Sequence, residues 1–399
     1  MTYLYEKIST SQGFSLIRKD RVFLVRKLEG LIFDCDGVIF DVSESFRSAI
    51  MLTVNWFFNV VMGFSVDELA KPDHIQLLKD SGGFNNDWEL TYALVLYYLT
   101  TLIIDALTKS VHLKLPSSSS VSTMNEAYSL FRELGRMLRK RGVQLKPATS
   151  LELEEYIEEA GNGGLRSVEE VSARRVSAAT GISTSHAKAV LDALSPFKGD
   201  LYGTNIIKRY FEELYSGKDL FVQVYRVHPV FHRGEGLIEK EKLMVRREAL
   251  AGLISFGFPP IGIASGRLRK QTLPIIERYG VERFFNLPAS TFLEEVKEKE
   301  EELLRVGVSV KLEKPNPYSL LSTASKMGIR EAFGYVGDTV SDVLASINAE
   351  KESKYSVMSI GVLCSTVNKA RTIEKFLELG CDIIAHSPNE LPEILAEVC

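Results

Sequence analysis

Cysteine and histidine are scarce in this sequence, and they are not clustered. The 399 residues include four cysteines and six histidines. The cysteines are dispersed and form no CxxC pair: Cys35, Cys364, Cys381 and Cys399. A disulfide framework or a zinc site needs clustered or regularly spaced ligands, so neither is expected. Dispersed, unpaired cysteines are typical of a protein kept in a reducing cytoplasm.

An excess of basic charge is also absent. The chain carries 48 Lys and Arg residues against 52 Asp and Glu residues, which gives a formal net charge of -4 at pH 7. Binding to nucleic acid or to an anionic membrane surface favours a basic excess. We therefore expect a small molecule as the partner, and no nucleic acid or membrane. Both a monomer and a homodimer are compatible with the sequence.

No apolar run is long enough to be an evident membrane span. The most apolar stretch, residues 90–104, contains three threonines and is followed by an aspartate. It is shorter than the roughly 20 residues that a span requires, so we expect a buried helix there. Residues 1–29 lack the basic and apolar segments of a secretory signal. Residues 22–25 show a strand-like alternation, and we expect residues 1–29 to add a strand or a hairpin to the core.

Two aspartates follow a short apolar run near the start of the chain. Residues 30–33 are continuous and apolar, as in a central strand of a parallel sheet whose two faces are covered. Asp34 and Asp36 lie at the end of this strand, and Gly37 breaks it. Ligands of open α/β sheets bind outside the carboxyl ends of the strands. Two carboxylates this close need a cation or a shared proton, and Mg²⁺ fits their oxygen atoms best.

Later segments repeat this pattern of a polar side chain after a predicted strand. One apolar segment ends at Ser265, and another ends at Asp338, with Asp342 about one helical turn further on. A helix that follows such a strand offers backbone N–H groups to an anion. Between these segments lies Lys314, whose backbone is kept extended by the proline that follows it.

Residues 43–245 show few strand signals. Their apolar residues recur at spacings of three and four, which predicts helices. Residues 72–88 combine a glycine pair with amides and a lysine, and serve either as a helix cap or as a loop that recognises a polar anion. We therefore expect a helical insertion after the two acids, with the sheet continuing beyond it.

The order of these parts resembles that of the haloacid dehalogenase superfamily. Four segments match its motifs: Asp34-Cys35-Asp36-Gly37-Val38, Ala264-Ser265-Gly266-Arg267, Lys314-Pro315-Asn316-Pro317 and Gly337-Asp338-Thr339-Val340-Ser341-Asp342. The sequence is similar to the members with a helical cap inserted after the first motif, which include phosphoglycolate phosphatases and β-phosphoglucomutases. The resemblance implies a doubly wound, parallel-sheet α/β core of Rossmann-like topology in residues 1–42 and 246–399. It also implies an enlarged, mostly helical cap domain in residues 43–245.

The resemblance further implies a Mg²⁺-dependent phosphatase that hydrolyses a small phosphomonoester through an aspartyl-phosphate. Asp34 would be the nucleophile, and Asp36 would protonate the leaving oxygen and then activate water. The residues that would hold the metal are Asp34, Asp338, Asp342 and, through its backbone carbonyl, Asp36. The residues that would hold the phosphoryl group are Ser265, Gly266, Arg267 and Lys314. Lys311 competes with Lys314, which is favoured because a proline follows it.

Other functions use the same motifs. A phosphomutase has the same residues and differs in releasing no inorganic phosphate. A non-catalytic module would bind a phosphorylated ligand, although such a member usually lacks Asp34 or Asp338. A protein or lipid phosphatase is disfavoured because a lid over the strand ends restricts access to small substrates. A dehalogenase is disfavoured because halide departure does not need the acid that Asp36 supplies.

The candidates for substrate specificity in the cap are Arg47, Lys79 and Asn86. Lys79 offers a point charge to an anionic substrate. We expect Lys79→Ala to raise KM for the true substrate and to leave the turnover of a minimal phosphate ester unchanged. Steady-state kinetics with the two esters test this expectation. An unchanged KM for the true substrate would exclude Lys79 from the site.

Overall fold

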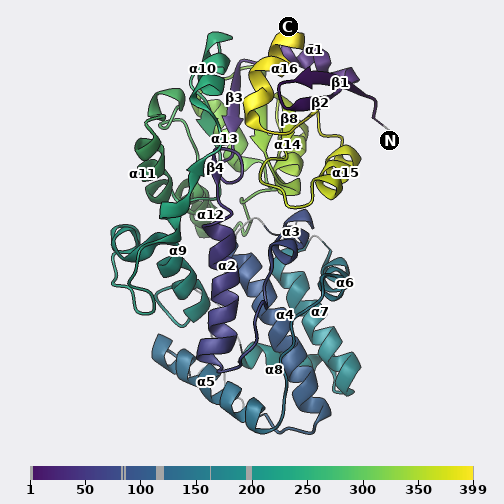
Figure 1. Cartoon of the computed structure of the whole chain (residues 1–399), viewed down its shortest axis with the longest axis vertical. Helices are drawn as coiled ribbons and strands as arrows, with labels where there is room; N and C mark the ends of the chain where they lie inside the picture. The colour runs from purple at the N-terminus through teal and green to yellow at the C-terminus, as the bar shows by residue number, and fades with distance from the viewer. Residues whose placement is uncertain are drawn as a thin grey trace. The chain divides into compact units, whose positions relative to one another are not determined.

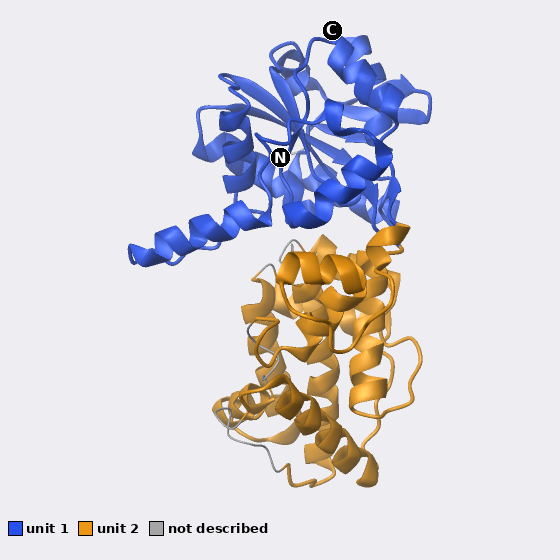
Figure 2. Ribbon diagram, turned by 90° about the vertical axis from the view of Figure 1, so that its left-hand side faces the viewer, with its two compact units in different colours: residues 1–43, 241–399 blue, residues 44–240 orange. Residues whose placement is uncertain are grey.

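The computed structural model describes residues 3–81, 84, 87–113, 121–161, 163–194 and 200–398. The chain forms two compact units, residues 1–43 with 241–399 and residues 44–240 (Figure 2). We call the first the α/β unit and the second, which is inserted into it, the helical unit. The observed boundaries follow residues 43 and 240, whereas the boundaries predicted from the sequence follow residues 42 and 245. Residues 241–245 therefore belong to the α/β unit.

The α/β unit contains a seven-stranded sheet in the order β1-β2-β9-β8-β7-β3-β6 (Figure 1). The strands are β1 (Tyr5–Thr10), β2 (Gly13–Arg18), β3 (Gly30–Phe33), β6 (Gly262–Ile263), β7 (Ala332–Gly337), β8 (Ser356–Val362) and β9 (Ile383–Ala385). The part of the sheet from β9 to β6 is parallel throughout. The parallel-sheet α/β fold predicted from the sequence is therefore confirmed.

The first two strands form an antiparallel hairpin that extends the sheet beside β9. This confirms the added strand or hairpin expected in residues 1–29. The segment that suggested it is a short helix, α1 (Val22–Val25). Leu24 and Val25 are buried in this helix. These apolar side chains are therefore removed from water without strand pairing.

Helices of the α/β unit follow and separate the strands. They are α10 (Arg247–Ser255), α11 (Arg269–Tyr279), α12 (Leu293–Arg305), α13 (Tyr318–Lys326), α14 (Val340–Glu352), α15 (Lys369–Leu379) and α16 (Leu391–Val398). Every residue of β3 and of β7 is buried, which explains why their sequences are continuous apolar runs. The acids predicted to form the site follow these two central strands.

The chain leaves the α/β unit for the helical unit and later returns to it. The segments next to these two points pair as a short antiparallel ribbon within the α/β unit. Its strands are β4 (Phe40–Asp41) and β5 (Lys242–Leu243), and Phe40 lies opposite Leu243. The chain thus leaves and re-enters the α/β unit side by side. The ribbon places the residues just before β5 close to the turn that follows β3.

The regular elements described in the helical unit are helices. They are α2 (Phe46–Asn55), a π-helical turn (Trp56–Val61), α3 (Pro72–Asp80), α4 (Asp87–Thr108), α5 (Met124–Lys140), α6 (Ser150–Ala160), α7 (Gly164–Thr180), α8 (Thr184–Ala193), α9 (Ile206–Tyr225) and a 3-10 turn (Leu237–Lys240). The helical character predicted for the insertion is therefore observed in the part of it that the structure describes.

Helix α4 contains the most apolar stretch of the chain. It is long and apolar enough to cross a membrane, but 78% of its most apolar window is buried inside the structure. The Tyr98 hydroxyl on this helix donates to the Leu69 carbonyl and accepts a 3.0 Å hydrogen bond from the Ala148 N–H. The buried helix predicted for residues 90–104 is confirmed.

Gly135 lies in close contact with the backbone of Met62 in the helical unit. It lies in α5, and a Cβ there would be only 2.0 Å from the carbonyl oxygen of Met62. Alanine would otherwise favour the helix by about 0.5–1 kcal/mol over glycine. We expect Gly135→Ala to lower the free energy of unfolding by about 1–3 kcal/mol, because the helix must shift away from Met62. Thermal unfolding followed by circular dichroism measures this, with the exposed Ser129→Ala as the control, and a stabilised Gly135→Ala protein would contradict the close contact.

Candidate active site

The turn after β3 presents the first two acids. The Asp34 N–H donates to the Val336 carbonyl on β7 at 2.9 Å, which extends the parallel pairing up to the nucleophile candidate. The chain then turns back, with hydrogen bonds from Ile39 and Phe40 N–H to the Cys35 carbonyl. Gly37 adopts a left-handed φ of 74° within this turn. A glycine is needed here because other residues rarely adopt that φ.

Lys314 lies between two carboxylates. It follows α12 and precedes α13, and its side chain is buried. Its Nζ atom is 3.0 Å from Asp34 Oδ2 and 2.6 Å from Asp342 Oδ1. Nζ also donates to the Tyr335 hydroxyl at 2.9 Å. Lys311, the competing candidate, has an exposed side chain, so Lys314 is the lysine that the fold brings to Asp34.

The charges in this network shift one another's pKa values. Burial would lower the pKa of Lys314, but the charges of Asp34 and Asp342 outweigh burial and raise that pKa, so the ammonium stays protonated. Burial would raise the pKa of Asp342, but the charge and hydrogen bonds of Lys314 lower it below its ordinary value. Burial dominates for Asp34, whose pKa is raised in spite of Lys314. The protein therefore compensates the negative charge of Asp34 less than that of Asp342.

Asp342 is held by more than the lysine. Its Oδ1 also accepts a 3.1 Å hydrogen bond from the Tyr335 hydroxyl. Its Oδ2 accepts hydrogen bonds from the N–H and the hydroxyl of Thr339, at 3.1 and 2.6 Å, which cap the first turn of α14. Both oxygens of Asp342 thus have protein donors, and the residue anchors Lys314.

A divalent cation fits the remaining acids. Asp34, Asp338 and Asp342 each offer an oxygen, and these oxygens lie within 4.8 Å of one another. Oδ1 of Asp34 is buried and has no hydrogen-bond partner among the described residues. A Cβ at Gly37 would lie 2.1 Å from Asp338 Oδ2, so only glycine leaves space beside that carboxylate. Buried carboxylate oxygens of this kind are the ligands that Mg²⁺ prefers.

These observations divide the three acids into two roles toward a cation. Asp34 and Asp338 would hold it directly, since the oxygens of Asp342 already accept hydrogen bonds from the protein. Ser365, which follows β8, donates its hydroxyl to Asp338 Oδ2 at 2.5 Å and orients that carboxylate. The parts expected of the Asp36 carbonyl and of Asp342, directly or through water, stay predictions.

The strand end at β6 places Ser265 next to the acids in the sheet. The Ala264 N–H donates to the Phe33 carbonyl at 3.0 Å, so Ser265 follows the strand that pairs with β3. Ser265 is buried, and its hydroxyl accepts a 3.3 Å hydrogen bond from the Arg267 N–H. Gly266 lies between them. The phosphate-binding roles of these residues stay predictions, and the described contacts of the Arg267 guanidinium are with carboxylates.

The three specificity candidates lie in the helical unit. Arg47 is buried in α2. Lys79 is near the end of α3, and its Nζ is 3.3 Å from a carboxylate oxygen of Asp87. Asn86 lies outside the residues that the structure describes. Their roles in specificity stay predictions.

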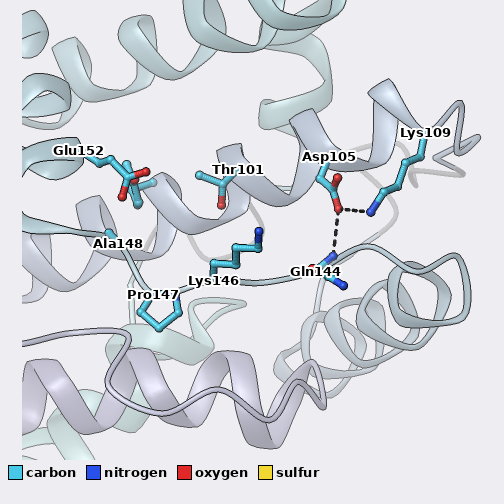
Figure 3. A pocket seen from close by; sticks show the side chains of 9 residues that line it. Thr101, Asp105, Lys109, Gln144, Lys146, Pro147, Ala148 and Glu152 are labelled. Carbon is cyan, nitrogen blue, oxygen red and sulfur yellow. Dashed lines mark hydrogen bonds and ion pairs between the residues drawn. The ribbon is translucent and has the colours of Figure 1, made fainter.

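A hollow of about 290 Å³ in the helical unit is a separate feature (Figure 3). It lies between α4 and residues 144–152. Asp105 on its wall accepts hydrogen bonds from Lys109 Nζ at 2.8 Å and from the Gln144 N–H at 3.0 Å. Asp105 and Lys109 therefore pair with each other on this wall.

Three residues of the site were not predicted from the sequence: Tyr335, Ser365 and Glu241. Tyr335 lies inside an apolar strand, where a tyrosine is indistinguishable from a core aromatic. Ser365 follows β8 within a few residues, so the rule that strand ends carry functional groups could have found it. Glu241 precedes a strand of only two residues, which no sequence pattern announces.

No family model and no curated protein sequence matches the chain. An X-ray structure described as Northeast Structural Genomics Consortium target ZR25 superposes with a TM-score of 0.58 and 17% identity, over 93% of this chain and 99% of that one. Phosphatase Tt82 from Thermococcus thioreducens has a TM-score of 0.43 and 19% identity, over 87% and 98% of the two chains. A haloacid dehalogenase-like hydrolase from Bacteroides fragilis has a TM-score of 0.42 and 12% identity, over 91% and 99%.

The fold has the features that the resemblance to the haloacid dehalogenase superfamily implied. The chain shares its fold with a solved structure over nearly its whole length. It has the parallel sheet and the helical unit inserted after the first strand-end motif that the resemblance implied. The first and second motif segments follow β3 and β6, the third lies between α12 and α13, and the fourth begins at the end of β7.

We expect the stability of the protein to depend on Mg²⁺, because the acid cluster fits a divalent cation. A cation at about 100 times its Kd would stabilise the folded protein by about 2.7 kcal/mol. We expect Asp338→Asn to lose most of the rise in Tm that Mg²⁺ causes, because one of the two direct ligands is weakened. Without metal, the same variant should be at least as stable as the wild type, because a buried negative charge beside Asp34 is removed.

Thermal unfolding with and without Mg²⁺ measures both effects. Asp73→Asn, at an exposed position of α3, is the matched control and should keep the full Mg²⁺ response. An equal Mg²⁺ response in the Asp338→Asn protein would show that the cluster does not hold the ion.

Proposed function

We propose that this protein is a Mg²⁺-dependent phosphatase that hydrolyses a small phosphomonoester through an aspartyl-phosphate on Asp34. The observation that carries this proposal is the placement of Asp34 in contact with buried Lys314 and within a cluster of acids that fits a divalent cation. A phosphomonoester dianion and a carboxylate repel each other, so the reaction needs fixed positive charge at this point. The fold offers it at the strand end where the nucleophile lies.

In the first step, a carboxylate oxygen of Asp34 attacks phosphorus and the bond to the leaving oxygen breaks. Asp36 donates a proton to that oxygen, so that it departs as an alcohol. Lys314 stabilises the negative charge that gathers between the carboxylate and the phosphoryl group. Magnesium, when bound, would supply further positive charge beside the phosphoryl oxygens.

In the second step, water attacks the phosphorus of the aspartyl-phosphate. Asp36, now a carboxylate, accepts the proton of that water, and the bond between Asp34 and phosphorus breaks. The products are inorganic phosphate and the original form of both acids. Ser265 and Gly266 support these steps by offering donors to the phosphoryl oxygens from the end of β6.

The substrate is proposed to be a small phosphorylated metabolite of the cytoplasm, with neither nucleic acid nor a membrane as partner. The net charge of -4 supports this, because it offers no general attraction to polyanions. Arg47, Lys79 and Asn86 are proposed to select the substrate from the helical unit. The protein is proposed to act as a monomer or a homodimer.

Phosphate release from a panel of phosphorylated metabolites tests this function. We expect release that requires Mg²⁺, and we expect Asp34→Asn to abolish it because no aspartyl-phosphate can form. We expect Lys314→Met to lower kcat by about 10²–10³-fold, the effect of losing one charge-stabilising donor. Lys311→Met is the matched control and should retain nearly full activity.

Circular dichroism of each variant separates loss of activity from loss of folding, since Lys314→Met leaves two buried carboxylates unpaired. Release by the Asp34→Asn protein at the wild-type rate would refute the proposed nucleophile. Conversion of a substrate to its isomer without phosphate release would replace hydrolysis by the mutase reaction.

A further inference from the structure

Asp36, the second acid of the turn after β3, lies next to a further buried ion pair, which Arg267 and Glu241 form. The Arg267 side chain is 1% exposed and that of Glu241 is not exposed at all. Nη2 of Arg267 donates to both carboxylate oxygens of Glu241, at 2.7 and 2.8 Å. Nε of the same guanidinium is 3.3 Å from Asp36 Oδ1. One arginine thus links a fully buried glutamate to the predicted general acid.

The fold holds the glutamate in place from several directions. Glu241 directly precedes β5, which pairs with β4 just beyond the turn that carries Asp36. The Tyr279 hydroxyl donates to the backbone carbonyl of Glu241 at 2.7 Å. The Phe40 ring on β4 lies 5.7 Å from the guanidinium carbon of Arg267, within range of a cation–π contact. The pair is therefore oriented by the ribbon on one side and by α11 on the other.

A buried ion pair of this kind is weak evidence for stability. Moving two charges out of water costs about as much as their attraction returns, and apolar residues of similar volume often replace such a pair without loss. The pair does fix direction, because both carboxylate oxygens of Glu241 hold the same terminal nitrogen of the guanidinium and both side chains are buried. The consequence for Asp36 is a cation held at a constant place and angle beside one of its oxygens.

We propose that Arg267, anchored by Glu241, positions Asp36 for proton transfer to the leaving oxygen. Glu241 is then a positioning residue that acts through Arg267 and touches neither the substrate nor the metal. This inference rests on the proposed phosphatase function. It also gives Arg267 a different role from the phosphate binding expected from the sequence, because its guanidinium pairs with the carboxylates of Asp36 and Glu241.

The dependence of kcat/KM on the leaving group reports proton transfer to the leaving oxygen. A purely structural role of Glu241 would not change this dependence. Ethyl phosphate needs a proton on its leaving oxygen, whereas p-nitrophenyl phosphate loses a stable phenolate without one. The ratio kcat/KM covers the reaction up to the first irreversible step and so excludes the later hydrolysis of the aspartyl-phosphate. We expect Glu241→Gln to lower kcat/KM for ethyl phosphate by about 10–100-fold, part of the 10²–10⁴-fold effect of a general acid. For p-nitrophenyl phosphate we expect a loss of less than about 3-fold.

A double-variant cycle separates positioning from general damage. In an Asp36→Asn background, Glu241→Gln should change kcat/KM for ethyl phosphate by less than about 2-fold, because the group that it positions is gone. Glu248→Gln, at an exposed position of α10, removes a glutamate charge nearby in the sequence and is the control that should leave both esters unaffected. Should Glu241→Gln fail to fold, Arg267→Met combined with Glu241→Leu removes both charges together and carries the same expectation.

Equal losses for the two esters, or additive losses in the Asp36→Asn background, would overturn the proposal. Crystal structures of the wild type and of the Glu241→Gln protein add a measurement that does not depend on activity. The Asp36 carboxylate should lie beside Arg267 in the first and turn away in the second. If the wild type releases no phosphate from any ester, the proposed function fails, and an unchanged Asp36 orientation in the variant then overturns the positioning role on its own.

Discussion

The buried ammonium group of Lys314 is the element on which the site depends. It contacts Asp34 and Asp342 at 3.0 and 2.6 Å, while Asp338 lies in the same cluster of acids. Without this lysine, burial would force at least one of these carboxylates to take up a proton. With it, one positive charge still faces three acids. The cluster therefore remains short of positive charge, and this deficit is the physical reason why it fits a divalent cation.

Much of the α/β unit was predictable from the sequence, because its central strands are buried on both faces. Strands β3 and β7 read as short apolar runs, and the acids that follow them are where ligands bind in open α/β sheets. Lys314 could be chosen over Lys311 from the neighbouring proline alone. The added strand or hairpin in residues 1–29 was predicted, but the apolar residues 22–25 that suggested it form a short helix.

The residues that support the acids were not predictable, because their roles come from contacts between distant parts of the chain. Ser365 is 27 positions from Asp338, and Arg267 is 26 positions from Glu241. Residues so far apart in the chain show no characteristic spacing from which their contact could be predicted. The helical unit has the same limit: periodicity predicts its helices, but not which polar side chains they bury. Glu213 in α9, for example, is fully buried because it accepts hydrogen bonds from Arg209 and from three backbone N–H groups at residues 230–232.

Two aspartates on one turn must do different chemistry in the proposed reaction, and their surroundings differ accordingly. Asp34 has to attack as an anion, and its carboxylate is in contact with Lys314, a cation whose own pKa is raised by the acids around it. Asp36 has to hold a proton and release it, and its side chain is 21% exposed and faces a guanidinium already bound to Glu241. Each cation is shared with a second carboxylate, Lys314 with Asp342 and Arg267 with Glu241, so the two acids differ in their burial and in the kind of cation that they face. The same strand end can therefore present one acid suited to nucleophilic attack and another suited to proton transfer, because separate cations approach them from β6 and from the segment before α13.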